Sequence, residues 1–145
     1  MLFFIKYGTI QYMLRIYLII LGILGSLDFL WLGIISKGFY KSYLGFLFRP
    51  QAYITPALLW YFIYSIGLIV FVISPAMKSN SSIKSVFILG SFLGLIAYST
   101  YNLVNYSTIA NWPLKVAIVD TLWGVLASGL TCALTFLIIN HFKIS

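Results

Sequence analysis

Residues 116–139 read VAIVDTLWGVLASGLTCALTFLII, an almost unbroken apolar run in which Asp120 is the one charged residue. An α-helix needs about 20 predominantly apolar residues to cross the hydrocarbon core of a bilayer. Three more runs reach this length, at residues 14–35, 54–76 and 86–106. We therefore expect four membrane-spanning helices, of which the last three are separated by short polar or proline-containing breaks.

The composition of the whole chain indicates the same class of protein. Of its 145 residues, 62% are hydrophobic and 8% are charged, whereas a soluble domain carries about 25% charged residues. This balance excludes a soluble enzyme, a disordered tail and a conventional nucleic-acid-binding domain. The net charge of +7 comes from singly scattered bases, as at the ends of membrane helices. One cysteine and one histidine provide neither an internal disulfide nor a multi-ligand zinc site, and we expect no cofactor.

Only helices and closed barrels satisfy every backbone polar group in lipid. We therefore predict an all-α, polytopic membrane protein whose four transmembrane helices form a compact bundle, with residues 1–145 as a single membrane domain. Residues 1–12 are interpreted as an N-terminal extension, because MLR at 13–15 before an apolar run is itself a typical start of a membrane protein. Between the first two spans, residues 36–53 carry aromatic pairs at helical spacing beside two lysines. This pattern is typical of an amphipathic helix in the headgroup plane, or of an aromatic-rich loop that caps the bundle.

Both acidic residues of the chain fall inside predicted spans, Asp28 in the first and Asp120 in the fourth. An aspartate at the centre of a membrane helix costs about 2.5–3.5 kcal/mol on the insertion scale, and such residues usually serve a function. Each of the two acids is also the first residue of a similar four-residue motif, DFLW at 28–31 and DTLW at 120–123. Their position therefore needs a physical reason.

The order of the spans brings these acids toward one side of the membrane. The first and third spans end on the side where the second and fourth begin. At a rise of 1.5 Å per residue, Asp28 lies about 10 Å and Asp120 about 6 Å from the end of its span, with Asn102 at a similar depth. Three polar side chains from three helices therefore share one leaflet, and we predict that they form a common site.

Aromatic residues at the same end of the spans, including Trp60, Tyr61 and Tyr64 of the second span, can form the walls of this site. The candidate ligand-binding residues are Asp28, Asp120, Asn102, Asn105, Tyr98, Tyr101, Trp31, Trp123, Tyr64 and Arg49. Each type also has a purely structural interpretation. The acids and asparagines can join helices by hydrogen bonds, the tryptophans and tyrosines can form interfacial belts, and Arg49 can anchor its segment at the headgroups.

Several of these words together resemble a known family of small predicted bacterial membrane proteins, the domain of unknown function 2177. The resemblance rests on DFLWL at 28–32, YLG at 43–45, RP at 49–50, PA at 75–76, TYNLVN at 100–105, WP at 112–113 and DTLWG at 120–124. The family usually reads TYDLTN, so Asn102 stands where it has an aspartate and Val104 where it has a threonine. An amide keeps the hydrogen bonds of the carboxyl group, but a role that needs a titrating acid at Asn102 is weakened. The resemblance implies four spans in the cytoplasmic (inner) membrane of a bacterium, and it implies no reaction.

Three functions are compatible with this pattern. We favour the binding or transport of a small lipophilic or cationic molecule, because carboxylates and aromatic faces both attract cations. A membrane enzyme or enzyme subunit in lipid modification is the second, with the two carboxyl groups as general acid and base. Against an enzyme, the sequence has no paired histidines and no recognisable nucleophile with a neighbouring base. The third is a structural or assembly partner without a ligand. The expected partners are the lipid bilayer, a small molecule, and a second copy or another membrane protein, but not nucleic acid.

Overall fold

Helices make up the regular secondary structure of this computed structural model, which describes the backbone of residues 2–144 and the side chains of residues 10–144. In chain order the elements are α1 (Leu2–Leu30), the π-helical turn η1 (Trp31–Ile35), α2 (Lys37–Leu44), the 3₁₀ turn η2 (Gly45–Leu47), α3 (Ile54–Leu68), the π-helical turn η3 (Ile69–Ile73), α4 (Ser74–Lys78), α5 (Ile83–Thr108) and α6 (Leu114–His141). The predicted all-α class is confirmed.

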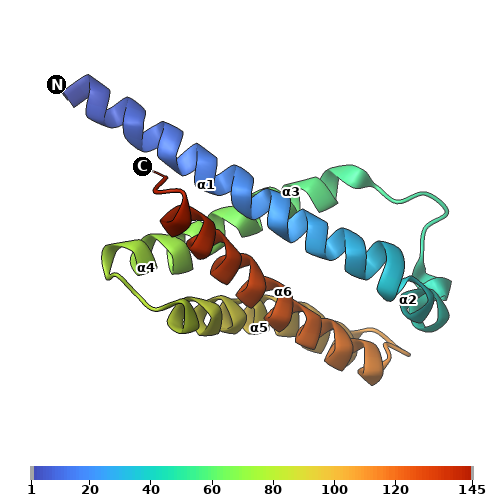
Figure 1. Ribbon diagram of the computed structural model, residues 1–145. Helices are drawn as coiled ribbons and strands as arrows, with labels where there is room; N and C mark the ends of the chain where they lie inside the picture. The colour runs from blue at the N-terminus through green and yellow to red at the C-terminus, as the bar shows by residue number, and fades with distance from the viewer. Residues whose placement is uncertain (1, 145) are drawn as a thin grey trace.

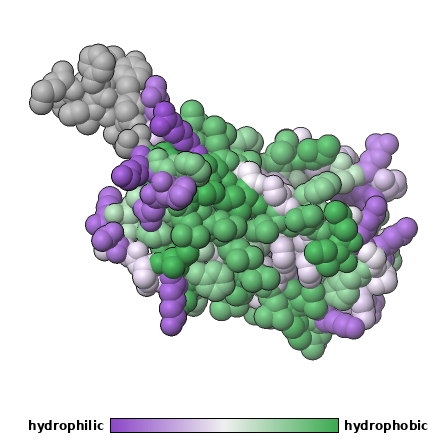
Figure 2. Space-filling view, in the orientation of Figure 1, coloured by the Kyte–Doolittle hydropathy of each residue, from purple (hydrophilic) through white to green (hydrophobic). Residues whose placement is uncertain are grey.

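Four continuous helical stretches are long and apolar enough to cross a membrane. They are Ile10–Ile35, Ile54–Lys78, Ile83–Thr108 and Leu114–His141. These stretches pack against one another as a bundle (Figure 1). Figure 2 shows a broad hydrophobic surface over the middle of the molecule and hydrophilic residues toward its two ends, as expected for a protein surrounded by hydrocarbon. The predicted polytopic bundle is confirmed, and the protein is a multi-pass membrane protein.

Two further segments adjoin the first membrane helix. The backbone of residues 2–12, interpreted from the sequence as an extension, continues α1 without a break, and residue 1 lies outside the described residues. Residues 36–53 contain α2 and η2, followed by a loop that leads into α3. The segment thus combines a short helix with a loop at one end of the bundle.

Two of the membrane helices contain a π-helical turn: η3 lies inside the second, and η1 forms the end of the first. Proline has no N–H group, and its ring clashes with the carbonyl group four residues earlier. For Pro75 this carbonyl belongs to Phe71, in the middle of η3. The other turn, η1, ends the first membrane helix, and there the N–H and the hydroxyl group of Ser36 both donate to the carbonyl oxygen of Trp31 at 2.7 Å. Because π-helical turns are frequent at functional sites, Trp31, the first residue of η1, is a candidate site residue on structural grounds also.

Glycines allow α5 and α6 to approach each other closely along their antiparallel course (Figure 1). A Cβ atom on Gly94 of α5 would overlap the backbone oxygen of Gly124 and the side chain of Ser128 on α6. Small residues at such a crossing let two membrane helices pack with their backbones in contact. This packing fixes the position of Asn102 on α5 relative to Asp120 on α6.

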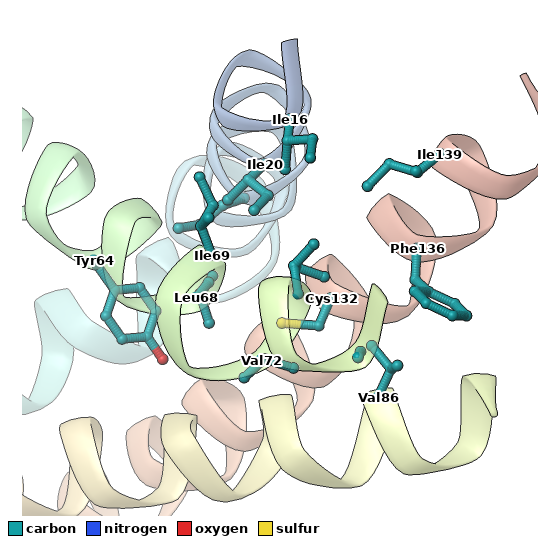
Figure 3. Close-up of a cluster of buried hydrophobic side chains, with 13 residues drawn as sticks. Ile16, Ile20, Tyr64, Leu68, Ile69, Val72, Val86, Cys132, Phe136 and Ile139 are labelled. Carbon is teal, nitrogen blue, oxygen red and sulfur yellow. The ribbon is translucent and has the colours of Figure 1, made fainter. Parts of the chain in front are cut away.

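Leu44, Trp112, Val116 and Ala117 form a small buried apolar cluster between α2 and α6. The larger cluster of buried apolar side chains lies in one half of the bundle, which we call the apolar half (Figure 3). Its members are Ile16, Ile20, Leu24, Tyr64, Leu68, Ile69, Val72, Ile73, Ala76, Val86, Cys132, Phe136 and Ile139. In α1 they precede Asp28, and in α6 they follow Trp123. Because these two helices run in opposite directions, the remaining ends of both lie together in the other half, the polar half, which contains both acids.

Candidate functional site

Asp28 is almost completely buried near the end of α1, with 3% of its surface exposed. The indole Nε1 of Trp123 on α6 donates to Asp28 Oδ1 at 2.8 Å. The hydroxyl group of Tyr61 on α3 donates to Oδ2 at 2.9 Å. Each carboxylate oxygen therefore accepts one hydrogen bond from a different helix, and the group joins α1, α3 and α6.

Asp120 lies in the second turn of α6 and is half-buried. Its Oδ1 accepts a hydrogen bond of 2.6 Å from the Tyr40 hydroxyl group on α2, and its Oδ2 accepts one of 2.7 Å from Asn102 Nδ2 on α5. Asn102 is fully buried, and its Nδ2 also donates to the carbonyl oxygen of Tyr98 at 3.0 Å. Asp120 thus joins α2, α5 and α6 in the same way as Asp28 joins its three helices.

Tyr40 lies outside the membrane-spanning helices, on α2. Burial raises the pKa of its phenol above the usual 10.0, and the hydrogen bond to the Asp120 carboxylate raises the pKa further. Tyr40 consequently keeps its proton at neutral pH and acts as the donor to Asp120. This hydrogen bond fixes the middle of α2 against the second turn of α6.

The two matching four-residue motifs, DFLW and DTLW, contact each other through their tryptophans. The rings of Trp31 and Trp123 stack with centroids 4.6 Å apart and planes inclined by 5°. Trp123 donates a hydrogen bond to Asp28, the acid of the other motif. Trp31 Nε1 donates to the Tyr40 hydroxyl group at 3.3 Å, and Tyr40 in turn donates to Asp120. The two acids are therefore linked by a stacked indole pair and its hydrogen bonds.

One cavity beside this network, of about 540 Å³, is lined by Asp28 and Tyr61 but not by Asp120. Two others have Asp120 in their walls, each with a volume of about 360 Å³. The first of these two, which we call the acidic cavity, is lined by Asp28, Leu32, Ala57, Trp60, Tyr61, Ala97, Tyr98, Tyr101, Asp120 and Trp123. The second, which we call the α2 cavity, is lined by Leu32, Lys37, Tyr40, Leu44, Phe48, Tyr101, Asn102, Trp112, Val116 and Asp120. Asp120 belongs to both cavities, whereas Asp28 lines only the acidic one of these two.

Most of the predicted site residues lie around these cavities. The acidic cavity takes Asp28, Asp120, Tyr98, Tyr101 and Trp123, the α2 cavity adds Asn102, and Trp31 stacks behind Trp123. The geometry thus brings together the three polar groups predicted to share one leaflet. Ligand binding by any of these residues stays a prediction.

Three further predicted residues line neither of these two cavities, although Tyr64 stacks on Trp60, which lines the acidic cavity. The Tyr64 hydroxyl group shares a hydrogen bond of 2.7 Å with Ser128, and the side chain belongs to the apolar half. The guanidinium group of Arg49 lies over the ring of Tyr53, 4.7 Å from its centroid, beside a different cavity. Asn105 is half-buried and lines neither the acidic cavity nor the α2 cavity.

The sequence placed Tyr61 in the aromatic wall of the site but did not predict its hydrogen bond to Asp28. It did not select Tyr40 as a site residue, although Tyr40 donates directly to Asp120. Tyr40 had only its place in an aromatic segment, and its partner Asp120 lies 80 positions further along the chain. Within the described residues, no cluster of three or more His, Cys, Asp or Glu side chains is arranged to hold a metal ion.

Comparison with known proteins gives one match. A family model described as "Predicted membrane protein (DUF2177)" matches residues 13–137. No curated protein and no solved structure matches the chain. The matched range covers both acids, both tryptophans of the stacked pair, and the residues that line the two cavities.

Proposed function

The chain belongs to the DUF2177 family of predicted membrane proteins, and we propose that this member binds or transports a small lipophilic cation at its acidic cavity. The proposed location is the cytoplasmic membrane of a bacterium. The ligand would lie between α1, α3, α5 and α6, at the depth of the two aspartates. Its apolar part would contact the aromatic walls, and its charge would face the carboxyl groups.

One observation carries the proposal, namely that Asp28 and Asp120 line a single cavity whose ten lining residues include no basic side chain. Opposite charges attract more strongly in a medium of low dielectric constant than in water. Five of the lining residues are tyrosine or tryptophan, and their ring faces attract cations in addition. The volume of about 360 Å³ lies within the usual range for small-molecule sites, about 300–1,000 Å³.

The hydrogen bonds of the acids also fit a binding role. An ionised carboxylate offers about four lone-pair positions, and each oxygen of Asp28 and Asp120 accepts one hydrogen bond from a protein side chain. The donors hold the carboxyl groups in position and leave further acceptor capacity. A cation could therefore bind without displacing Tyr61 or Trp123.

The same contacts favour a second candidate, in which the polar network only holds the bundle together. Asp28 connects α1 to α3 and α6, and Asp120 connects α6 to α2 and α5. Interhelical hydrogen bonds in membranes contribute on average about 0.6 kcal/mol and at most about 1.7 kcal/mol each. A purely structural network would change the stability of the bundle on mutation, but it would bind no cation.

The experiment that separates the two candidates uses the full chain in nanodiscs of phosphatidylcholine. Binding of tetraphenylphosphonium is measured by isothermal titration calorimetry, with the neutral triphenylphosphine oxide as the matched ligand and empty nanodiscs as the blank. We expect the cation alone to bind, and Asp28→Asn to weaken it about 10–100-fold, which corresponds to a loss of about 1.4–2.8 kcal/mol of charge attraction. Asp120→Asn is expected to act in the same direction. Equal affinity in the wild type and both variants, at equal amounts of folded protein, would overturn the proposal and favour the structural role.

A further inference from the structure

Two of the residues that line the α2 cavity each carry a buried polar atom for which the described residues provide no hydrogen-bond partner. These atoms are the acceptor Oδ1 of Asn102 and the donor Nε1 of Trp112. Asn102 is fully buried and Trp112 is 8% exposed, and both residues line the cavity. An unpaired buried polar group costs about 1–3 kcal/mol. A ligand that supplies one donor and one acceptor would remove both costs.

The same cavity is lined by one positively and one negatively charged side chain. Lys37 from α2 contributes an ammonium group, and Asp120 from α6 contributes a carboxyl group. A simple anion would be repelled by Asp120, and a simple cation would be repelled by Lys37. A zwitterion with separate positive and negative groups matches both residues.

The cavity lies where phospholipid headgroups are expected. Lys37 lies two residues after the end of the first membrane stretch, and Trp112 lies two residues before the start of α6. Lysine and tryptophan at the ends of membrane helices are typical of the headgroup level. Figure 2 shows hydrophilic residues at the end of the molecule where α2 lies in Figure 1. Apolar walls formed by Leu32, Leu44, Phe48 and Val116 suit the upper part of an acyl chain.

We propose that the α2 cavity binds a phosphoethanolamine group, carried either by phosphatidylethanolamine or by a soluble phosphate ester. The primary ammonium group would donate to Asn102 Oδ1 and to Asp120. The phosphate group would accept from Trp112 Nε1 and from Lys37. This ligand and this cavity differ from those of the proposed function, although Asp120 lines both.

Ligand chemistry provides the first test, because it leaves the protein unchanged. The full chain in detergent is titrated with phosphatidylethanolamine, its N,N-dimethyl derivative and phosphatidylcholine of the same acyl chains, and bound lipid is measured by native mass spectrometry. We expect phosphatidylethanolamine to bind about 10-fold more tightly than phosphatidylcholine, since a hydrogen bond to a charged group contributes about 1.5–3 kcal/mol. The dimethyl lipid keeps one N–H donor and is expected to fall between them. Equal binding of the three lipids would overturn the proposal.

Protein variants test the anionic part of the ligand. Trp112→Phe removes the unpaired donor but keeps an aromatic ring, and we expect about 3–10-fold weaker binding of phosphatidylethanolamine. Lys37→Gln is expected to weaken it similarly, whereas the matched variant Lys78→Gln, on α4, is expected to bind as the wild type does. If neither Trp112→Phe nor Lys37→Gln changes the affinity, the placement of the phosphate group is wrong.

A competition experiment distinguishes the two sources of the group. Glycerophosphoethanolamine that competes at the concentration of the lipid would support a soluble ligand. Competition only in large excess would support the lipid. Because Trp112 does not line the acidic cavity, Trp112→Phe is expected to leave tetraphenylphosphonium binding unchanged. Failure of this proposal is therefore distinguishable from failure of the proposed function.

Discussion

The apolar half and the polar half of the bundle are built by the same helices but are held together differently. In the apolar half, side chains such as Ile20, Leu68 and Ile73 have no exposed surface and belong to one packed cluster. In the polar half, two carboxyl groups hold five helices by side-chain hydrogen bonds, and cavities remain beside them. The comparison assigns stability chiefly to packing in the apolar half, whereas the proposed ligand binding belongs to the polar half.

The strongest way to break this comparison is a cavity in the apolar half. Leu68→Ala removes a fully buried side chain, and we expect it to lower the free energy of unfolding by about 2–5 kcal/mol. Leu59→Ala, at a 57% exposed position of the same helix, is the control and is expected to change it by less than about 1 kcal/mol. Equilibrium unfolding in mixed detergent, followed by tryptophan fluorescence, measures both. The comparison fails if Leu68→Ala weakens tetraphenylphosphonium binding while the folded protein retains wild-type stability.

The contact between α5 and α6 belongs to both halves, and its glycines give the next largest effect. In Gly94→Ala the added methyl group would overlap Gly124 and Ser128, so the helices must separate, and we expect a loss of about 1–3 kcal/mol. At Gly25 a Cβ atom meets no heavy atom within 4 Å. Gly25→Ala is therefore expected to be neutral or stabilising by up to about 1 kcal/mol.

Separation of α5 from α6 should also change the positions of polar groups in the polar half. Asn102 and Asp120 lie on these two helices and share a hydrogen bond of 2.7 Å. Gly94→Ala is accordingly expected to weaken tetraphenylphosphonium binding, unlike Leu68→Ala. A Gly94→Ala protein with wild-type stability and affinity would show that the close approach of α5 and α6 does not position these groups.

A smaller effect is expected from a single hydrogen bond in the polar half. Tyr61→Phe leaves Asp28 Oδ2 without its donor, and we expect the free energy of unfolding to fall by about 0.6–1.7 kcal/mol. The control Tyr53→Phe alters a 67% exposed side chain. If the cavity binds cations, tetraphenylphosphonium should stabilise Tyr61→Phe more than the wild type, because the cation then compensates the unpaired oxygen. Equal stabilisation of both proteins would favour the purely structural role of Asp28.

The two halves differ in how far the sequence predicts them. Long apolar runs predicted the four membrane helices because the bilayer itself imposes their length. Counting residues from the ends of the spans predicted that Asp28, Asn102 and Asp120 lie at similar depths, since the rise per residue of a helix is constant.

Contacts between distant segments could not be predicted in this way. Helical periodicity gives the face of a residue but not its partner on another helix, so the hydrogen bond between Tyr40 and Asp120 and the stacking of Trp31 on Trp123 were not expected. The same limit explains Tyr64, which lies one turn after Tyr61 but belongs to the apolar half. Arg49 lies in a loop, where no periodicity specifies its position.

The smallest expected effect is specific to α2, and it is a change in how the stability of the protein depends on pH. The pKa of Tyr40 is raised in the folded protein by burial and by its hydrogen bond to Asp120, relative to 10.0 for an exposed phenol. The unfolded chain therefore loses this proton at lower pH than the folded protein does. The stability contributed by Tyr40 is fully present below about pH 10 and is lost as the pH rises toward the folded pKa.

Tyr40→Phe removes this contribution. At pH 7 we expect a loss of about 1 kcal/mol or less, as for one hydrogen bond. Between pH 9 and pH 11 the wild type should lose stability more steeply than the variant, and the difference between them should shrink. Tyr43→Phe, a neighbouring half-buried position on α2, should keep the slope of the wild type. Parallel slopes for wild type and Tyr40→Phe would mean that the contact with Asp120 does not hold α2 against α6, and the α2 cavity would then lack its fixed wall.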